Sequence, residues 1–273
     1  KEVLCERHLI SRELAQKGAG SGVLVTADES IAVMVNEEDH LRFQAISPGL
    51  SLLEVWKVID GVDSDLEKHI DYAFSPTLGY LTACPSNVGT GLRASVMIHV
   101  PGLRLIQEVE QVTKGLARMG LAVRGLFGEG SDAYGNMFQI SNQATLGGTE
   151  SALIANLLKV VEEVVGHEVN ARARLMESRR NFVVDQVGRA FGVLTHASLL
   201  SSAEAVDLLS NLKLGVELEL VRNLTTARIH EIILLTQPGH MQKIAGKILE
   251  SEERDEMRAH MIRNRLKCVS VTG

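Results

Sequence analysis

Residues 23–35 read VLVTADESIAVMV, two apolar runs separated by a short polar segment. Both runs are rich in β-branched residues, so the pattern predicts a β-hairpin with its turn at residues 27–30. Working outward, the same reasoning predicts strands at 94–100, 121–127 and 136–140, the first ending before Pro101-Gly102. Apolar residues at helical spacing predict helices at 50–70 and 104–119. Mixed strands and helices make this an α+β portion.

The pattern changes after Gly147-Gly148. The rest of the chain predicts helices at 149–189, 201–221, 225–236 and 251–267, with Pro238-Gly239 ending the third and Ser251 capping the fourth. We therefore expect two domains: an α+β portion at residues 1–148 and an all-helical portion at residues 149–273.

Composition excludes several classes of protein. The chain has 273 residues, of which 45% are hydrophobic and 4% aromatic, with a net charge of −6. A chain with this share of hydrophobic residues can bury a sizeable core. Its net negative charge does not favour a nucleic-acid-binding surface. The sequence predicts no membrane-spanning helix. Three scattered cysteines suit a reducing, cytoplasmic compartment. The chain begins at Lys1 without a starting Met, and we expect an N-terminal segment to precede it.

Three polar clusters could hold a site. Residues 36–40 (NEEDH) place three adjacent acids at a strand end, with a solvated turn as the alternative. Residues 84–95 (CPSNVGTGLRAS) form a small-residue loop whose backbone N–H groups could approach an anion, although Cys84 could equally be a small buried hydrophobe. Residues 124–131 (RGLFGEGS) form a glycine-rich stretch around Glu129, or else a surface hairpin.

Arginines at strand positions and acids on loops suit phosphoryl transfer. Arginine guanidinium groups hold phosphates, and carboxylates can orient a cationic nucleophile. The residues that combine these features are Arg42, Arg93, Arg124, Glu38 and Glu129.

Four segments in this order resemble the catalytic domain of the ATP:guanido phosphotransferases, the family of arginine and creatine kinases: residues 36–40, 79–87, 89–96 and 124–130. The chain is most similar to a bacterial branch that phosphorylates arginine side chains of proteins and so marks them for the Clp protease. Residues 89–97, 235–239 and 254–259 are typical of that branch. The resemblance runs from His8 to about Leu266. It implies an antiparallel sheet flanked by helices, followed by the helical portion, and a role in protein quality control during stress.

The resemblance also implies residue roles. Glu38 and Glu129 would bracket the substrate guanidinium, align it and take up its proton, which matters because arginine is a poor nucleophile. Cys84 would lie near the guanidinium and tune the rate. ATP would be the donor, with Mg²⁺ held by phosphates and water because the sequence shows no obvious carboxylate for it. The implied nucleotide-binding residues are His8, Arg42, Arg93, Ala94, Ser95, Val96, Met97, Arg124, Gly125, Leu126, Phe127, Gly128 and Glu129.

Residues 254–259 (RDEMRA) match the phosphoarginine-binding segment of the branch. Arg254 and Arg258 share a helix face, where they would repel unless an anion lay between them, and Asp255 could receive a guanidinium. The resemblance makes this an allosteric site. On residue pattern alone, a solvated helix face paired with neighbouring acids is favoured.

Two other functions remain open from the sequence. One is a kinase for a small free guanidino compound. The other is a non-catalytic phosphoarginine-binding regulatory module, because the family's arginine-rich strand near its N-terminus is absent from residues 1–273. The implied partners are proteins with exposed arginine, a zinc-finger activator, the Clp unfoldase and a second copy in a homodimer. No nucleic acid or membrane partner is expected.

Overall fold

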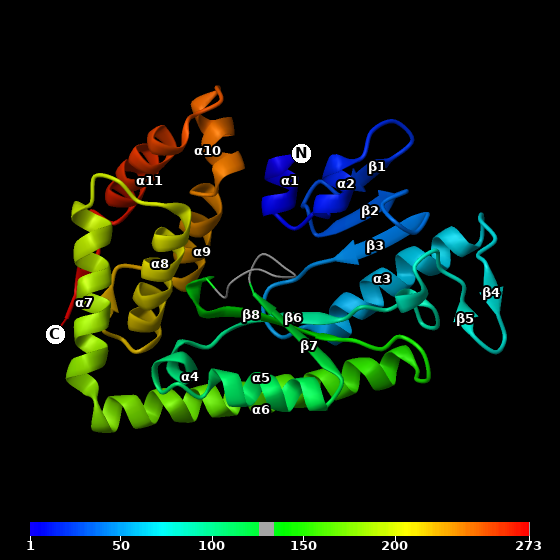
Figure 1. The fold of residues 1–273 in the computed structure, drawn as a ribbon, viewed down its shortest axis with the longest axis horizontal. Coiled ribbons are helices and arrows are strands. Elements are labelled where there is room, and N and C mark those ends of the chain that lie inside the picture. Colours follow the sequence, from blue (N-terminus) through cyan, green and yellow to red (C-terminus); the bar gives the residue numbers. More distant parts are fainter. Residues whose placement is uncertain (126–133, 273) are drawn as a thin grey trace. The chain divides into compact units, whose positions relative to one another are not determined.

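The computed structural model describes residues 1–125 and 134–272. It confirms an α+β fold with antiparallel sheets followed by a helical C-terminal part (Figure 1). The chain forms two compact units, each assembled from separated segments. The first unit contains residues 1–96, 115–123 and 140–163, and the second contains residues 97–114, 124–139 and 164–273.

The predicted hairpin is part of a three-stranded antiparallel sheet in the first unit. Strands β1 (Gly22–Val25), β2 (Ile31–Val35) and β3 (Leu41–Ala45) lie in the order β1-β2-β3. Alternate residues of β2 are buried, as the period of two predicts. Met34 on β2 is fully buried and packs on Ile10 and Leu14, which precede the sheet. These residues belong to a segment that contains helices α1 (Glu2–Glu6) and α2 (Arg12–Gln16) and packs against the sheet.

A second part of the first unit follows the predicted helix, which forms as α3 (Leu52–Glu67). The short strands β4 (Phe74–Ser75) and β5 (Gly79–Tyr80) pair, and Tyr80 also bridges to Gly89. At Gly89 φ is +111°, and a Cβ there would lie 2.4 Å from the carbonyl oxygen of Thr145. Only glycine allows this approach, which fixes the loop at residues 81–90 against residue 145.

The remaining predicted strands form a sheet of order β6-β8-β7. They are β6 (Ser95–His99), β7 (Leu121–Gly125) and β8 (Met137–Asn142). The prediction of one helix at 104–119 was wrong. Pro101 begins a short helix α4 (Pro101–Leu105), as its fixed φ allows, and Gln107 at φ +63° separates it from α5 (Val109–Arg118).

The C-terminal region is built from helices that differ in detail from the prediction. The expected helix at 149–189 is two helices, α6 (Glu150–Ser178) and α7 (Arg180–His196), because Arg179 leaves the helical region at φ −140°. The others are α8 (Ser202–Glu217), α9 (Thr226–Leu235), α10 (Pro238–Ala245) and α11 (Ser251–Arg265). The cap of α11 is Glu250 rather than Ser251, because Glu250 and Glu253 form a reciprocal capping box.

The C-terminal region is also not wholly helical. The helix expected at 201–221 ends at Glu217, and Val221 instead begins strand β9 (Val221–Arg222), which pairs with β10 (Ser270–Val271). Leucine, isoleucine and valine side chains from α7, α8, α9 and α11 form the core of the second unit. Within the described ranges, none of the helices is long and apolar enough to cross a bilayer.

A network of charged side chains lies inside the second unit. Glu168 of α6 is 4% exposed and accepts hydrogen bonds from the first N–H groups of α4, at Gly102 and Leu103. It also accepts from Arg172 Nε at 2.5 Å, and Arg172 Nη1 reaches Glu217 Oε2 at 2.6 Å. The carboxylates of Glu168 and Glu217 are thus both paired with Arg172, and such pairing offsets the cost of removing charges from water.

His99 adds an acid-sensitive group to this network. Burial lowers its pKa to about 4 from an ordinary value of 6.5, and the charges of Lys213 and Arg172 add to the effect while Glu217 opposes it. An unfolded chain therefore binds more protons than the folded one between these values, so we expect stability to fall as pH drops from about 6.5 to about 4. The midpoint urea concentration, measured across this range, checks the expectation.

The control for this pH dependence is His99→Asn, which keeps a polar group beside Ser210. Its unfolding midpoint is expected to change less than that of the wild type between pH 6.5 and pH 4. Identical pH profiles for the two proteins would show that His99 is not the acid-sensitive group.

Candidate active site

The acidic cluster forms the tip of the hairpin between β2 and β3. Asn36 takes a left-handed conformation (φ +54°) and its N–H donates to His40 O. Glu37 is 5% exposed and accepts a hydrogen bond from Arg42 Nη1 at 2.9 Å. Glu38 is exposed and makes no hydrogen bond or ion pair with another described residue. The alternative of a simple solvated turn therefore fails for Glu37.

Asp39 ties this tip to the loop that contains Cys84. One carboxylate oxygen, Oδ1, accepts from the N–H groups of Ala83 at 2.5 Å and Cys84 at 3.2 Å. The other, Oδ2, accepts from Asn87 Nδ2 at 2.9 Å. Segments separated by more than 40 residues in the sequence are thus held together by one side chain.

Cys84 lies half-buried on this loop. Its Sγ atom is 3.0 Å from Ser86 Oγ, so it has a polar environment and is not the buried hydrophobe of the alternative interpretation. Thr145 supports the loop, because its hydroxyl donates hydrogen bonds to the carbonyl oxygens of Ser86 and Val88. Thr145 itself is 4% exposed.

The predicted nucleotide-binding stretch at residues 93–97 leads from this loop into β6. Arg93 is exposed two residues before the start of the strand, whereas Ala94 is buried and its N–H donates to Asn142 Oδ1 at 2.8 Å. Asn142 Nδ2 in turn donates to Leu92 O. Because the backbone of Leu92 and Ala94 is held on both sides of it, Arg93 projects an exposed side chain from a fixed segment.

His8 lies beside β3. It has a left-handed backbone (φ +58°), and its carbonyl accepts a hydrogen bond from Gln44 Nε2. Gln44 is two residues beyond Arg42 and so lies on the same strand face. Desolvation, with the charge of Arg12, lowers the pKa of the His8 ring below its ordinary value of 6.5. The ring is therefore neutral near pH 7.

The remaining predicted residues belong to the second unit or fall outside the described residues. Arg124 and Gly125 end strand β7 and belong to the second unit, whereas Arg42 and Arg93 belong to the first. Leu126, Phe127, Gly128 and Glu129 lie outside the described residues. The structure therefore brings together Glu38, Arg42 and Cys84 through their neighbours, and the grouping of Arg124 and Glu129 with them stays a prediction.

The segment at residues 254–258 is not a solvated helix face. Arg258 is 1% exposed, and its guanidinium donates to Thr236 O at 2.9 Å, Leu200 O at 2.6 Å and Asp255 Oδ1 at 2.5 Å. Arg254 Nη1 donates to Leu249 O at 2.6 Å. The two arginines are thus accommodated by carbonyl and carboxylate oxygens of the chain itself.

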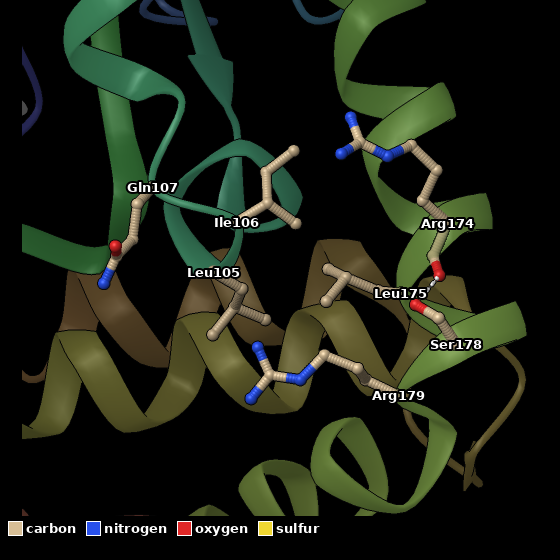
Figure 2. A pocket seen from close by; sticks show the side chains of 7 residues that line it. All are labelled: Leu105, Ile106, Gln107, Arg174, Leu175, Ser178 and Arg179. Carbon is tan, nitrogen blue, oxygen red and sulfur yellow. Dashed lines mark hydrogen bonds between the residues drawn. The ribbon is translucent and has the colours of Figure 1, made fainter.

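A separate pocket of about 320 Å³ lies in the second unit near the break between α6 and α7. Figure 2 shows Leu105, Ile106 and Leu175 between the guanidinium groups of Arg174 and Arg179. Both guanidinium groups have partners: Arg174 pairs with Glu108 at 3.1 Å, and Arg179 lies 4.2 Å from the ring centre of Phe182. None of the predicted site residues lines this pocket.

Within residues 1–125 and 134–272, no group of three or more His, Cys, Asp or Glu side chains could hold a metal ion. The buried carboxylate nearest the predicted site, that of Glu37, is bonded to Arg42. Mg²⁺ commonly keeps phosphate and water ligands rather than a cage of protein side chains.

Sequence reasoning missed the residues that organise this site. Asp39, Asn142 and Thr145 place the loop and the strand but touch residues far away in the sequence. For Asp39 there was one usable signal, since three adjacent acids cannot all point the same way along a strand end. Asn142 and Thr145 gave none.

Asp39→Ala is expected to impair both the fold of the loop and activity. Three donors would lose their acceptor, at a cost of about 1 to 3 kcal/mol in unfolding free energy. We expect a lower Tm and a lower kcat, measured by calorimetry and by a phosphotransfer assay. The matched control is Asp65→Ala, an exposed acid on α3, for which both quantities should match the wild type. An unaltered kcat in Asp39→Ala would contradict the organising role.

Comparison with known proteins shows the family to which the chain belongs. Residues 1–171 match the family ATP:guanido phosphotransferase, C-terminal catalytic domain, and residues 180–272 match the C-terminal domain of the protein-arginine kinase McsB. The chain is 26% identical to a lombricine kinase of known structure, with a TM-score of 0.55 over 63% of this chain and 51% of that one. The chain therefore belongs to the ATP:guanido phosphotransferase family, in which ATP is the phosphoryl donor.

The chain is also similar to proteins named protein-arginine kinase. The chain is 47% identical to the protein-arginine kinase of Halothermothrix orenii, over 97% of this chain and 76% of that protein. It is 46% identical to that of Halalkalibacterium halodurans, over 98% and 75%. Within the family, this is a protein-arginine kinase, which transfers phosphate from ATP to arginine.

Proposed function

We propose that the acceptor is an arginine side chain of a protein and that Glu38 and Glu129 bracket its guanidinium. The observation that best supports this is the contact of Asp39 with Ala83, Cys84 and Asn87, because it fixes the exposed Glu38 next to the Cys84 loop. A carboxylate on a fixed backbone can align the guanidinium and accept its proton as the N–P bond forms, while the bond between the γ-phosphorus and its bridging oxygen breaks and ADP leaves.

The arginines would bind and neutralise the phosphates of ATP. Arg42 is oriented by Glu37, and Arg93 ends a fixed segment, so both can point at an anion with little loss of side-chain freedom. Arg124 would complete the set together with His8 and residues 94–97. Mg²⁺, when bound to the phosphates, would supply further charge neutralisation.

The acceptor is tested by offering ATP with either a basic protein or free arginine. Acid-labile phosphate on arginine of the protein, with little transfer to free arginine, is the expected result. Equal or preferential transfer to free arginine would support a kinase for small guanidino compounds instead. Binding of phosphoarginine with no nucleotide affinity would support a regulatory module.

We also propose that residues 254–258 sense phosphoarginine. Asp255 is 29% exposed on its side chain and could receive a ligand guanidinium, while Arg254 could exchange the Leu249 carbonyl for a phosphate. Arg254→Ala is the informative variant, because Arg258 is tied into the fold. Calorimetric titration with phosphoarginine should show at least about tenfold weaker binding in Arg254→Ala, the loss of one charge-assisted contact.

The control for that titration is Arg228→Ala. Arg228 is an exposed arginine on α9, and its guanidinium pairs with Glu231 of the same helix. The variant should bind phosphoarginine as the wild type does. Equal affinity of Arg254→Ala and the wild type would contradict a role for this segment in binding.

The wider role follows from the family and is proposed on that basis. Arginine phosphorylation by this chain would mark proteins for Clp-type proteolysis, in the cytoplasm, with a zinc-finger activator, and the kinase would act as a homodimer. Pull-down of the Clp unfoldase by a phosphorylated substrate, but not by the same substrate before phosphorylation, tests the first of these claims.

A further inference from the structure

Strand β8 ends at Asn142, whose side chain is bonded entirely to backbone groups. Its Oδ1 accepts a hydrogen bond from the N–H of Ala94 at 2.8 Å, and its Nδ2 donates to Leu92 O at 2.9 Å and to Ala144 O at 3.0 Å. Asn142 is 4% exposed, so these bonds are shielded from water. The carboxamide group offers one acceptor oxygen and two donor hydrogens, and all three are in use.

Two of these backbone partners lie on either side of Arg93. The backbone N–H of Asn142 also donates to Ala94 O at 3.3 Å, so Ala94 is held at both its N–H and its carbonyl. Leu92 is held at its carbonyl by Asn142, and its N–H donates to the hydroxyl of Thr90 at 3.2 Å. The backbone polar groups of the residues before and after Arg93 are therefore all paired.

The side chain of Arg93 differs from its surroundings. It is exposed, and within residues 1–125 and 134–272 its guanidinium forms no hydrogen bond or ion pair. Ordering the backbone of a residue costs conformational entropy, so an arginine on a backbone that is already ordered loses less freedom when it binds an anion. The hydrogen bonds of Asn142 thus prepare Arg93 for an anion through the neighbouring backbone.

We propose that Asn142 is a positioning residue for ATP binding, because it fixes the backbone from which Arg93 projects. The inference rests on the proposed role of Arg93 in holding the phosphates of ATP. Aspartate has nearly the same shape but no donor, and leucine has neither a donor nor an acceptor. The bonds to Leu92 and Ala94 therefore specify the chemistry of residue 142 as well as its size.

A neighbouring residue supports a different part of the same loop. Thr145 is also 4% exposed, and its hydroxyl donates to Ser86 O at 3.0 Å and to Val88 O at 2.7 Å. Neither of these carbonyl groups adjoins Arg93. Thr145 is therefore a matched control for the burial and the polar contacts of Asn142.

The proposal predicts a change in the affinity for ATP. Without the Asn142 side chain, the backbone around Arg93 gains freedom that ATP binding must then restrict. Ordering the backbone of one residue corresponds to a factor of about 5 to 30 in affinity. In titration calorimetry of the full chain with ATP and Mg²⁺, Asn142→Ala is expected to bind about 5- to 30-fold more weakly than the wild type. Thr145→Val should lose much less affinity, although both variants should have a lower Tm.

The decisive measurement is a double-mutant cycle with Arg93→Ala. If Asn142 acts through Arg93, Asn142→Ala should weaken ATP binding in the wild-type background and should have no further effect in the Arg93→Ala background. The same loss in both backgrounds, equal losses in Asn142→Ala and Thr145→Val, or wild-type affinity in Asn142→Ala would overturn the proposal. Wild-type affinity in Arg93→Ala would instead refute the proposed role of Arg93, and the inference with it.

A second variant and a second measurement cover the case in which Asn142→Ala does not fold. Asn142→Gln keeps the donor and the acceptor but displaces them by one methylene group, and its effect on ATP binding should likewise disappear in the Arg93→Ala background. Hydrogen exchange measures the contact itself: the Ala94 amide should exchange faster in either Asn142 variant than in the wild type, but not in Thr145→Val. Equal exchange of this amide in all four proteins would contradict the positioning role.

Discussion

Glu38→Gln is expected to reduce kcat for arginine phosphorylation by about 10²- to 10⁴-fold, the range for loss of a general base. The change removes the negative charge that would align the guanidinium and accept its proton, but it keeps the size of the side chain. Because Glu38 is exposed at the hairpin tip and bonded to no other described residue, its charge does not stabilise the fold. Its Tm should therefore stay within about 2 °C of the wild-type value.

Glu37→Gln is the matched control on the adjacent position. Glu37 is buried and holds Arg42, so its substitution should lower the Tm and raise the KM for ATP rather than act mainly on kcat. The steady-state parameters and Tm of both variants, measured side by side, separate the two roles. A Glu38→Gln variant that loses Tm in proportion to its activity would show that Glu38 is structural.

Arg258→Ala is expected to cost about 3 to 5 kcal/mol of unfolding free energy, the range for breaking a buried ion pair. The substitution leaves Asp255 without its partner and removes the donor from the carbonyl groups of Leu200 and Thr236. Urea unfolding followed by circular dichroism measures the loss.

Arg254→Ala provides the comparison for Arg258→Ala. It removes a single hydrogen bond to Leu249 O, for which about 0.5 to 1.5 kcal/mol is expected. A similar small loss in Arg258→Ala would contradict the structural role of that residue. The consequence for ligand studies is direct: weak phosphoarginine binding by Arg258→Ala would reflect a damaged fold.

Local sequence patterns predicted the elements whose causes are local. The hairpin at residues 23–35 and the strand at 94–100 formed where short runs rich in β-branched residues are bounded by turn residues. The break at Arg179 was not predictable, since no proline or glycine marks it and the residue is held by its contact with Phe182. The split at Gln107 likewise had no signal in the sequence.

The candidate site shows the same limit. Family resemblance indicated Glu38, Cys84 and the arginines, but only coordinates show that Asp39 joins the first two. The charged segment at residues 254–259 has the pattern of a surface helix, but Arg258 is buried, and its guanidinium donates to the carbonyl oxygens of Thr236, just after α9, and Leu200, just before α8. Long-range contacts of this kind leave no periodicity in the sequence.

The most direct test of the central claim compares Glu38→Gln, Glu129→Gln and the double variant in single-turnover transfer from ATP to a basic protein. If both carboxylates act on one guanidinium, they work as a unit, so the double variant should be about as slow as the slower single variant. Rate losses that multiply, so that the double variant is slower by the product of the two single effects, would show that the two acids act independently and would contradict the account.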